Sequence, residues 1–587
     1  MHIARVDLIN QSIMDEEISP EIIKAYLGGR GLGSWYIWHS FRQDPAAFSR
    51  QDPLIFLNSP LTGTGAPGAV KLTAVARSPL TGAIGMSFCG GQAARVLRQT
   101  GYDGFIITGK APRPLYLVIE DGAISFREAS SYRGWLTGQV ESRLQEEYPG
   151  QEVAVLSIGP AGENGVKYAS IMHAGHAFGR GGLGAVMGAK NLKAIALVSN
   201  RGKKPALAPG FNAAVRELNR KIARSPRLQM FGVNGTAGNV KVVNERGLHP
   251  AYYYQHTQFD KLKDLAGIWF APYIVKREGC FACPIRCRKL VALEAQQEPW
   301  SGPEYETLWS FGANCGNANV KSILEANYWC NEYGLDTIST GNCIGFLMAC
   351  RQRWFIDAGP AFGDVESFAG LIRSIAYKEG LGALVADGVR PAARKLGCEG
   401  LAMQVKGMEL SGYDPRGAKG MGLGYATSPR GACHERGFIP QEVFGSPPPL
   451  DRYSPEKAEL VIRRQNEVAV LDSLGICVFS SGPDGFDLET AAGMLSLATG
   501  MDFSAADLYR CGERICNVER LFNCAHGFTS QEDTLPARFL REPDAAGPSA
   551  GQVVELEYML ARYYKLRGWN EDGIPSAATL KRLALEG

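Results

Sequence analysis

Apolar residues recur with two different periods along the chain. Up to about residue 200, short apolar runs stand between Gly and Pro turns and predict strands at 53–57, 70–76, 104–110, 114–120 and 152–159. Beyond residue 210, apolar positions recur at helical spacing behind polar capping residues, which predicts helices within 211–225, 322–334, 367–380 and 455–475. The sequence shows no internal repeat and no low-complexity segment.

This change of period predicts an α+β fold. We expect a β-rich N-terminal cofactor-binding domain at 1–203, followed by two mainly α-helical domains at 204–405 and 406–587. The basic, proline-containing stretch 199–210 is predicted to be the linker after the first domain.

Composition narrows the class of protein. The chain has 587 residues, of which 45% are hydrophobic and 21% charged, a globular balance that excludes a wholly disordered chain. Lys+Arg 62 against Asp+Glu 59 leaves a formal charge of +3, which gives no case for a nucleic-acid partner. No apolar run approaches the ~18 residues of a membrane span, and the N-terminus lacks a signal-peptide pattern. We therefore expect a cytoplasmic protein.

Three of the 14 cysteines form a metal-binding pattern. Cys280, Cys283 and Cys287 fall within eight residues of one predicted loop. Thiolates are the soft ligands of iron–sulfur clusters and of zinc. A [4Fe–4S] cluster is favoured, with its fourth ligand among the remaining cysteines. A zinc site and unrelated core thiols are the alternatives, and the lack of a second CxxC pair disfavours zinc.

Glycine is enriched, at 70 residues, and gathers in loops at 28–35, 59–71, 76–95 and 179–193. Such loops expose backbone N–H groups that suit phosphates, and Arg30, Arg77, Arg95 and Arg180 add positive charge. Any one of these loops is explained as a tight turn. Four in one domain favour a large phosphorylated cofactor.

Acidic residues and one histidine are the remaining candidates for chemistry. Asp336 in GLDTISTG and Asp472 in DSLGIC can accept hydrogen bonds from a heterocycle or cap helices. Glu304 and Glu306 in GPEYETLW and His434 in RGACHERG can move protons or serve as structural residues.

Taken together, these motifs resemble the aldehyde:ferredoxin oxidoreductase family of tungsten–pterin enzymes. The resemblance runs nearly end to end in motif order. It is carried by ARSPLTG (76–82), GPAGEN (159–164), FGRGGLGAVMGAKNLKAI (178–195), CFACPIRC (280–287), GPEYET (302–307), GLDTISTG (334–341), RGACH (430–434), DSLGIC (472–477), GERICNVERLFNCAHGF and EDTLPAR (512–538).

The resemblance implies a set of cofactors and ligands. A β-rich base would carry two pterin dithiolenes that hold one tungsten or molybdenum, with Mg²⁺ bridging the pterin phosphates. A [4Fe–4S] cluster would be bound by Cys280, Cys283, Cys287 and Cys477. Arg77 would lie between pterin and cluster. The other pterin-binding positions would be Arg180, Gly181, Gly182, Leu183, Asp336, Asp472 and Ile476.

One segment departs from the family pattern. An Asn-Ser-Gly-Gly ending is expected after ARSPLTGAIGMS, where the Asn side chain helps to hold magnesium. This chain has Phe88-Cys89-Gly90-Gly91 instead. The side-chain ligand to Mg²⁺ is therefore in question.

The implied activity is oxidation of an aldehyde to a carboxylic acid. Glu306 and His434 would be the proton-transfer or carbonyl-polarising pair, with Glu304 competing for the role of Glu306. Electrons would pass through the cluster to ferredoxin or to an iron–sulfur partner subunit. The chain has no flavin or nicotinamide motif, so we expect an external acceptor and an oligomer or multi-subunit complex.

Two other functions are weighed. The same superfamily contains the catalytic subunit of class II, ATP-independent benzoyl-CoA reductases, in which a cysteine ligates tungsten and a Glu/His cluster lines the pocket. Cys315, Glu245 and His249 resemble that branch. The last alternative is an electron-transfer protein that carries only an iron–sulfur cluster, which the Gly-rich β domain disfavours.

Overall fold

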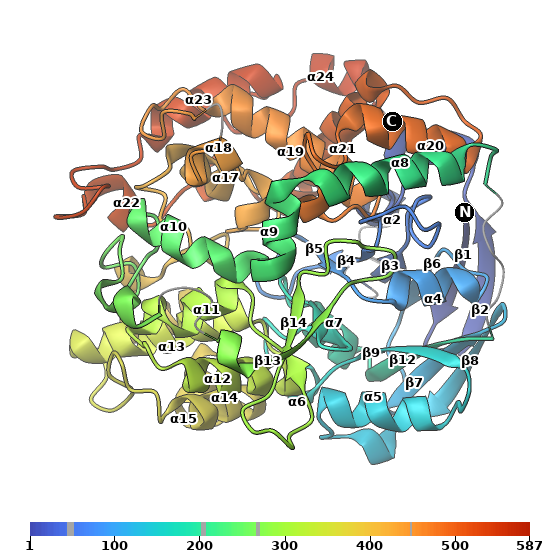
Figure 1. The fold of residues 1–587 in the computed structure, drawn as a ribbon. Coiled ribbons are helices and arrows are strands. Elements are labelled where there is room, and N and C mark those ends of the chain that lie inside the picture. The colour runs from blue at the N-terminus through green and yellow to red at the C-terminus, as the bar shows by residue number, and fades with distance from the viewer. Residues whose placement is uncertain (44–51, 201–206, 266–269, 447–448, 587) are drawn as a thin grey trace.

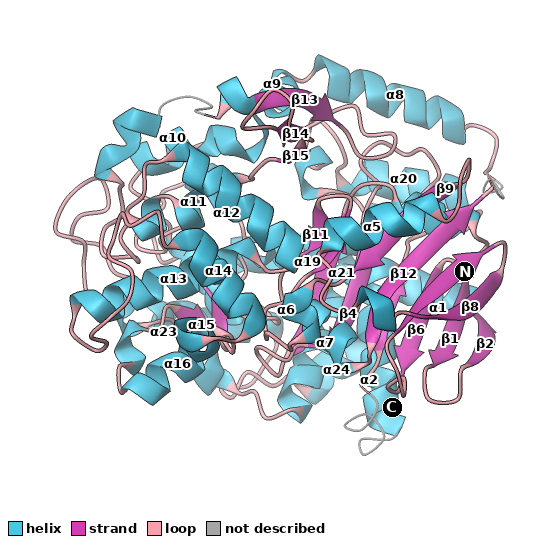
Figure 2. Cartoon of the chain, turned by 90° about the horizontal axis from the view of Figure 1, so that it is seen from below, coloured by secondary structure: helices cyan, strands magenta, loops and turns pink. Residues whose placement is uncertain are grey.

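The computed structural model describes residues 1–43, 52–200, 207–265, 270–446 and 449–586. Strands gather on one side of the molecule and helices cover the other (Figures 1 and 2). The α+β expectation is confirmed: a sheet-rich N-terminal part precedes a mainly helical region. Half of the predicted linker, residues 201–206, lies outside the described residues, and the bounds of the three domains stay predictions.

The first sheet has six strands in the order β2-β1-β6-β3-β4-β5. Only β1 and β6 are parallel neighbours. The strands are β1 (His2–Asp7), β2 (Ser12–Glu17), β3 (Leu54–Leu57), β4 (Leu72–Arg77), β5 (Ile84–Cys89) and β6 (Gly104–Thr108).

The second sheet repeats this topology strand for strand. Its order is β11-β10-β9-β12-β7-β8, and β7 and β12 are again the only parallel neighbours. The strands are β7 (Leu115–Glu120), β8 (Ala123–Glu128), β9 (Glu152–Ser157), β10 (Ile171–His173), β11 (His176–Phe178) and β12 (Leu192–Ser199). The expectation of no internal repeat is thus wrong at the level of the fold. The strand order has been kept although the two halves differ in sequence.

Successive side chains on a strand point to opposite faces of the sheet, and this alternation builds two hydrophobic cores. On β3, Phe56 faces the core shared by both sheets, whereas Ile55 and Leu57 face a second core. Helices α4 (Ala93–Gln99) and α7 (Leu183–Ala189) pack into the shared core. Helix α2 (Gly29–Gln43) covers the second, and α1 (Pro20–Tyr26), α5 (Thr137–Glu146) and α6 (Pro160–Glu163) complete this part.

The four predicted helices correspond to α8 (Phe211–Arg224), α12 (Val320–Tyr333), α14 (Phe368–Tyr377) and α19 (Ala458–Ser473). The sequence did not predict a small sheet of β13 (Ile274–Glu278), β14 (Arg288–Val291) and β15 (Trp300–Ser301). The remaining elements are α9 (Pro226–Asn234), α10 (Asn239–Glu245), α11 (Tyr305–Phe311), α13 (Thr337–Gln352), α15 (Gly380–Val385), α16 (Val389–Leu396), β16 (Gln404–Val405), β17 (Met408–Glu409), α17 (Lys419–Thr427), α18 (Pro440–Val443), α20 (Leu488–Thr499), α21 (Ala505–Ala525), α22 (Ala537–Arg541), α23 (Leu556–Arg567) and α24 (Ala577–Arg582).

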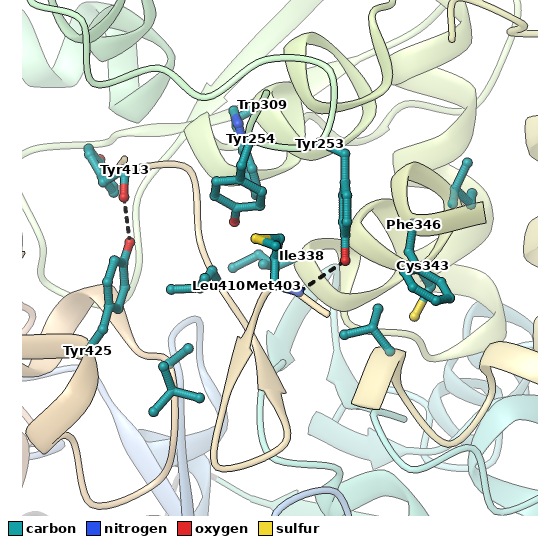
Figure 3. Close-up of a cluster of buried hydrophobic side chains, with 14 of the residues drawn as sticks. Tyr253, Tyr254, Trp309, Ile338, Cys343, Phe346, Met403, Leu410, Tyr413 and Tyr425 are labelled. Carbon is teal, nitrogen blue, oxygen red and sulfur yellow. Dashed lines mark hydrogen bonds between the residues drawn. The ribbon is translucent and has the colours of Figure 1, made fainter. Parts of the chain in front are cut away.

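One hydrophobic core spans most of the helical region. Residues from both sides of the predicted 405/406 boundary share it, among them Trp309, Phe346 and Tyr425 (Figure 3). Tyr425 donates a hydrogen bond to the backbone oxygen of Tyr413, 3.1 Å away. Among the described residues, no helix is both long and apolar enough to cross a membrane.

Candidate cofactor and catalytic site

Two short segments of the helical region dock on the two sheets in the same way. The N–H of Cys477 donates to the oxygen of Gly68, and the N–H of Val70 donates to the oxygen of Gly475. In the other half, the N–H of Asp336 donates to Tyr168, and Ser170 donates to Gly334. Cys477 and Asp336 are therefore equivalent positions in the repeat, whereas Asp472 precedes its docking segment by three residues and has a different place.

Three cysteines lie in the loop between β13 and β14. Ala282 and Arg286 take positive φ values of 54° and 53°, which turns the loop tightly around its thiols. Burial, and then the neighbouring Cys477 thiol, raise the pKa of Cys283 to about 11. The docking of the segment that ends in Cys477 thus brings a fourth thiol to this loop.

The spacing of these thiols bears on the zinc alternative. No group of three His, Cys, Asp or Glu within the described ranges is close enough to hold a single metal ion. Structural zinc needs four ligands about 2.0–2.3 Å from one ion, so zinc gains no support here. A four-iron cluster is a larger object and requires a wider gap between its thiols.

Arg77 does not lie beside the cysteines. It ends β4 opposite Ile84, whereas the cysteine side of this hairpin is the pair Leu72 and Cys89. Five residues of strand separate these ends, about 16 Å. The Arg77 side chain instead donates to the oxygen of Gly82 at 3.2 Å. The expectation that Arg77 lies between the cofactor and the cluster is therefore corrected.

Lys71 is a buried cation beside the cysteines. Burial works to lower its pKa, but the nearby thiols of Cys477, Cys280 and Cys89 outweigh burial and raise it. Sequence reasoning missed Lys71 because the conspicuous arginine of ARSPLTG stands at the wrong end of the strand.

Arg180 and Asp336 form a buried pair. The Arg180 Nε lies 3.1 Å from the Asp336 carboxylate, and its other nitrogens donate to the backbone oxygens of Ala432 and Glu409. Asp336 also caps α13 by accepting from the N–H of Ile338. Both readings of Asp336 from the sequence, helix cap and polar site residue, thus apply to one carboxylate.

Asp472, which belongs to the half of the site that contains Cys477, is held by two arginines. Arg30 lies 3.1 Å from its carboxylate and also makes a two-pronged bond to Glu519, at 2.7 Å for each nitrogen. Arg436 contacts the same Asp472 oxygen and lies over the Phe88 ring, 5.0 Å from its centre. Phe88 offers no oxygen to a magnesium ion, which prefers oxygen ligands.

Several buried polar atoms at this site have no hydrogen-bond partner among the residues that the structure describes. They include Nε of Arg430, Nε and Nη2 of Arg436, Oε1 of Glu306 and Nδ1 of His434. Buried donors without partners are rare because each costs about 1–3 kcal/mol. Unsatisfied guanidinium groups beside Arg30, Arg180 and Lys71 fit a large anionic group, as pterin phosphates would be.

The glycine loop before α7 also has free donors. Gly182 is the N-cap of α7 at φ 74°, and the N–H groups of Gly181, Gly182 and Leu183 donate to no other described residue. Leu183 itself is buried in the core between the sheets. Ile476 is likewise buried, in the bridge with Ala69. At Leu183, therefore, only the backbone is available to a ligand, and at Ile476 the N–H already donates to the oxygen of Leu471.

Glu306 and His434 face each other. Glu306 Oε1 lies 3.7 Å from His434 Nδ1, and the other oxygen of Glu306 accepts from the N–H of Gly412 at 2.8 Å. Burial raises the pKa of Glu306 to about 8 and lowers the pKa of His434 to about 4. At neutral pH the pair is therefore a neutral carboxylic acid beside a neutral imidazole.

Glu304 points elsewhere. It accepts from the Thr236 hydroxyl and raises the pKa of Cys287, after burial, so it lies on the cysteine side. The structure thus brings Glu306, not Glu304, to His434. The sequence spacing could have distinguished the two glutamates, because side chains two residues apart at the start of a helix that begins at Tyr305 point to different sides.

The residues that resembled the benzoyl-CoA reductase branch do not converge on this pair. Cys315 is fully buried, and its thiol donates to the backbone oxygen of Ser310 at 3.2 Å. Glu245 pairs with Lys241 on the surface. His249 is buried against the Tyr305 hydroxyl, 3.0 Å away.

Comparisons with known proteins identify the family. Residues 3–199 match the family model described as aldehyde ferredoxin oxidoreductase, N-terminal domain, and residues 213–585 match domains 2 and 3 of the same family. The matched family is a family of oxidoreductases. The chain belongs to the aldehyde ferredoxin oxidoreductase family and is an enzyme of that type.

Relatives match over the whole length. The tungsten-containing aldehyde ferredoxin oxidoreductase of Pyrococcus horikoshii is 42% identical, with 100% of this chain and 98% of that protein covered. The Pyrococcus furiosus enzyme of the same name is 40% identical, at 99% and 98% coverage. The WOR-like subunit of an aliphatic sulfonate oxidoreductase from P. furiosus is 30% identical, at 99% and 96%.

A solved structure shares the fold. The active site complex BamBC of benzoyl coenzyme A reductase, in complex with 1,5-dienoyl-CoA, has a TM-score of 0.87. It covers 100% of this chain and 96% of that chain at 23% identity. This likeness concerns architecture alone.

Proposed function

We propose that this chain oxidises aldehydes to carboxylic acids at a tungsten–bis(pterin dithiolene) centre and passes the electrons through a [4Fe–4S] cluster to ferredoxin or a partner subunit. The observation that carries the proposal is the Glu306–His434 pair, buried and mutually unsatisfied beside a site lined with buried arginines. The names of the relatives supply the substrate class and the metal.

The residues present fit the metal cofactor, which supplies the two-electron redox chemistry when bound. Arg436, Arg430, Arg180 and the free N–H groups at 181–183 would hold its anionic groups, and Asp336 and Asp472 would accept from its ring N–H groups. Cys280, Cys283, Cys287 and Cys477 would bind the cluster, with Lys71 beside it. A bridging Mg²⁺ stays a prediction, with no side-chain oxygen from 88–89 to hold it.

The acid–base pair sets up the substrate. Protonated Glu306 can donate to an aldehyde oxygen through Oε1, because its Oε2 is already fixed by the N–H of Gly412. Neutral His434 can accept the proton that is released when the product acid forms. The low-dielectric surroundings strengthen both interactions.

Benzoyl-CoA-type reduction has less support. The Cys315 thiol is fully buried and donates to the backbone oxygen of Ser310, and no contact joins it to Glu306 or His434 among the described residues. A protein with only a cluster does not account for Arg430 and Arg436, whose unsatisfied buried donors need an anion.

The proposal is tested by metal content and turnover together. Tungsten, molybdenum and iron are quantified per chain, and benzyl viologen reduction is followed anaerobically with aliphatic and aromatic aldehydes. We expect about one tungsten, about four iron atoms and aldehyde turnover, as one mononuclear centre and one cluster require. The same metals without turnover of any aldehyde would reject the aldehyde assignment, and iron without tungsten would leave only a cluster protein.

A further inference from the structure

Helix α9 lies across both cysteine-bearing segments. The Phe231 ring packs at a tilt of 35° against Phe479, two residues beyond Cys477, with the ring centres 4.6 Å apart. The next residue, Gly232, approaches the three-cysteine loop so closely that a Cβ there would lie 2.5 Å from the oxygen of Ile285. The inner face of α9 is thus fixed against the predicted cluster site. Figure 1 shows α9 beside the β13–β14 hairpin.

The outer face of α9 is apolar and open. Met230 is 60% exposed and Val233, one turn later, is 42% exposed. Val275 on β13 is 55% exposed. Ala282 and Pro284 of the cysteine loop are also exposed. Large apolar side chains held in solvent over a redox site are typical of an interface used transiently.

The rim of this face carries unpaired positive charge. Arg277 and Arg286 are both exposed, and neither forms an ion pair with any residue that the structure describes. Arg286 donates to the backbone oxygen of Arg277 at 3.1 Å, which holds the two arginines together. Nearby charges are already matched, since Lys276 pairs with Glu278 and Arg227 pairs with Asp484.

We propose that Met230, Val233, Val275, Arg277 and Arg286 form the docking face for a small acidic iron–sulfur electron carrier. The proposal rests on the proposed function and adds to it where the partner binds and what charge it carries. The apolar residues form the centre of the contact, and the arginines steer carboxylates onto its rim.

The position suits electron exit. Tunnelling slows steeply with distance, so a carrier gains most by docking where the cysteine loop itself is at the surface. Here Ala282 and Pro284 are exposed between the predicted ligands. A second copy of this chain fits less well, because a two-fold contact at this face would bring the same unpaired arginines together.

The test compares a protein acceptor with a small dye on the same holoenzyme. Arg277 and Arg286 are both changed to Glu, and aldehyde-dependent reduction of an acidic ferredoxin and of benzyl viologen is measured at several salt concentrations. We expect the KM for ferredoxin to rise about tenfold or more and its salt dependence to weaken, because rim charges act on encounter. Turnover with benzyl viologen should stay within about twofold.

Two further variants make the result specific. Arg394→Glu, an exposed arginine on α16 far along the chain, carries the charge change of one of the two substitutions and should leave the ferredoxin KM unaltered. Met230→Glu places a carboxylate in the apolar centre. This single change should raise the ferredoxin KM even with both arginines in place. An unchanged ferredoxin KM in both the arginine and Met230 variants, with viologen turnover intact, would overturn the docking face. Failure of the unmodified enzyme to turn over aldehydes with viologen would instead reject the proposed function.

Discussion

The Oε1 atom of Glu306 and the Nδ1 atom of His434 lie 3.7 Å apart, and neither has another hydrogen-bond partner. Burial moves their pKa values in opposite directions, to about 8 and about 4. The pair therefore has a donor and an acceptor at neutral pH without any charge. Gly412 donates to the other carboxylate oxygen, which leaves Oε1 to face His434.

This pair predicts the pH profile of aldehyde oxidation. The rate with benzyl viologen should fall above pH about 8, where Glu306 loses its proton, and below pH about 4, where His434 gains one. Glu306→Gln keeps a donor and removes the titration, so the alkaline limb should disappear. Glu306→Ala should lower kcat by about 10²–10⁴. An alkaline limb that persists in the Gln variant would remove Glu306 from this role.

The same carboxyl predicts a pH dependence of stability. Its pKa is raised in the folded chain from an ordinary 4.5 to about 8, so between these values the unfolded chain has released a proton that the folded chain still holds. Stability should therefore fall as pH rises from about 4.5 to about 8 and level off above. Melting temperatures of the enzyme and of Glu306→Gln across this window should converge at the acid end, and parallel curves would contradict the assignment.

Lys71 predicts the potential of the cluster. Replacing it with Gln removes a positive charge beside the thiols, which disfavours the extra electron of the reduced state. The midpoint potential should shift negative by on the order of 50 mV, from Coulomb's law in a partly shielded site. Arg77→Gln, at the far end of the same strand, is the matched control and should leave the potential in place. An anaerobic redox titration followed by electron paramagnetic resonance measures both.

The cysteine assignment predicts which thiols iron needs. Cys477→Ser should lower iron content and remove viologen turnover, because the docked segment supplies the fourth thiol. Cys524→Ser alters a thiol on α21 outside the cysteine loops and should keep about four irons per chain. Full iron retention in Cys477→Ser would show that another residue is the fourth ligand.

Close packing at the glycine loop predicts a stability difference between two glycines of similar φ. At Gly182, φ is 74° and a Cβ would lie 2.0 Å from the oxygen of Lys167, whereas at Gly165, φ is 66° and no atom lies within 4 Å. Gly165→Ala should cost about 1–2 kcal/mol from backbone strain alone. Gly182→Ala should cost more, by about 1–3 kcal/mol, because the backbone must also move. Equal costs in thermal unfolding would show that strain is the whole effect.

The sequence predicted the fold where pattern is local. Strands such as β3 and β9, and helices such as α12, follow from the spacing of apolar residues and from the Gly, Pro and capping residues at their ends. Gly334 ends α12 with a φ of 72°, and Asp336 caps the next helix, as their residue types favour. The small sheet β13–β15 was missed because its strands are short and mostly polar.

Sequence reasoning named candidate site residues where those residues stand inside a recognisable motif. The three-cysteine loop, Asp336, Asp472, Glu306 and His434 all reach one region. Arg77 and Lys71 show where motif reading fails. Arg77 is the last residue of β4 and Lys71 comes just before its first residue, so the two lie at opposite ends of the strand. Only strand pairing decides which end meets Cys89. Arg430 and Arg436 were missed because a sequence does not show which guanidinium groups are buried without hydrogen-bond partners.

The repeated docking of two segments on two equivalent sheets has an evolutionary consequence. An ancestral half-site, doubled, would present the same residue on both sides and treat them alike. Here the matching positions hold a carboxylate, Asp336, on one side and a thiol, Cys477, on the other. The two halves therefore differ in the group that they present: a thiol next to the three-cysteine loop on one side, and a carboxylate paired with Arg180 on the other.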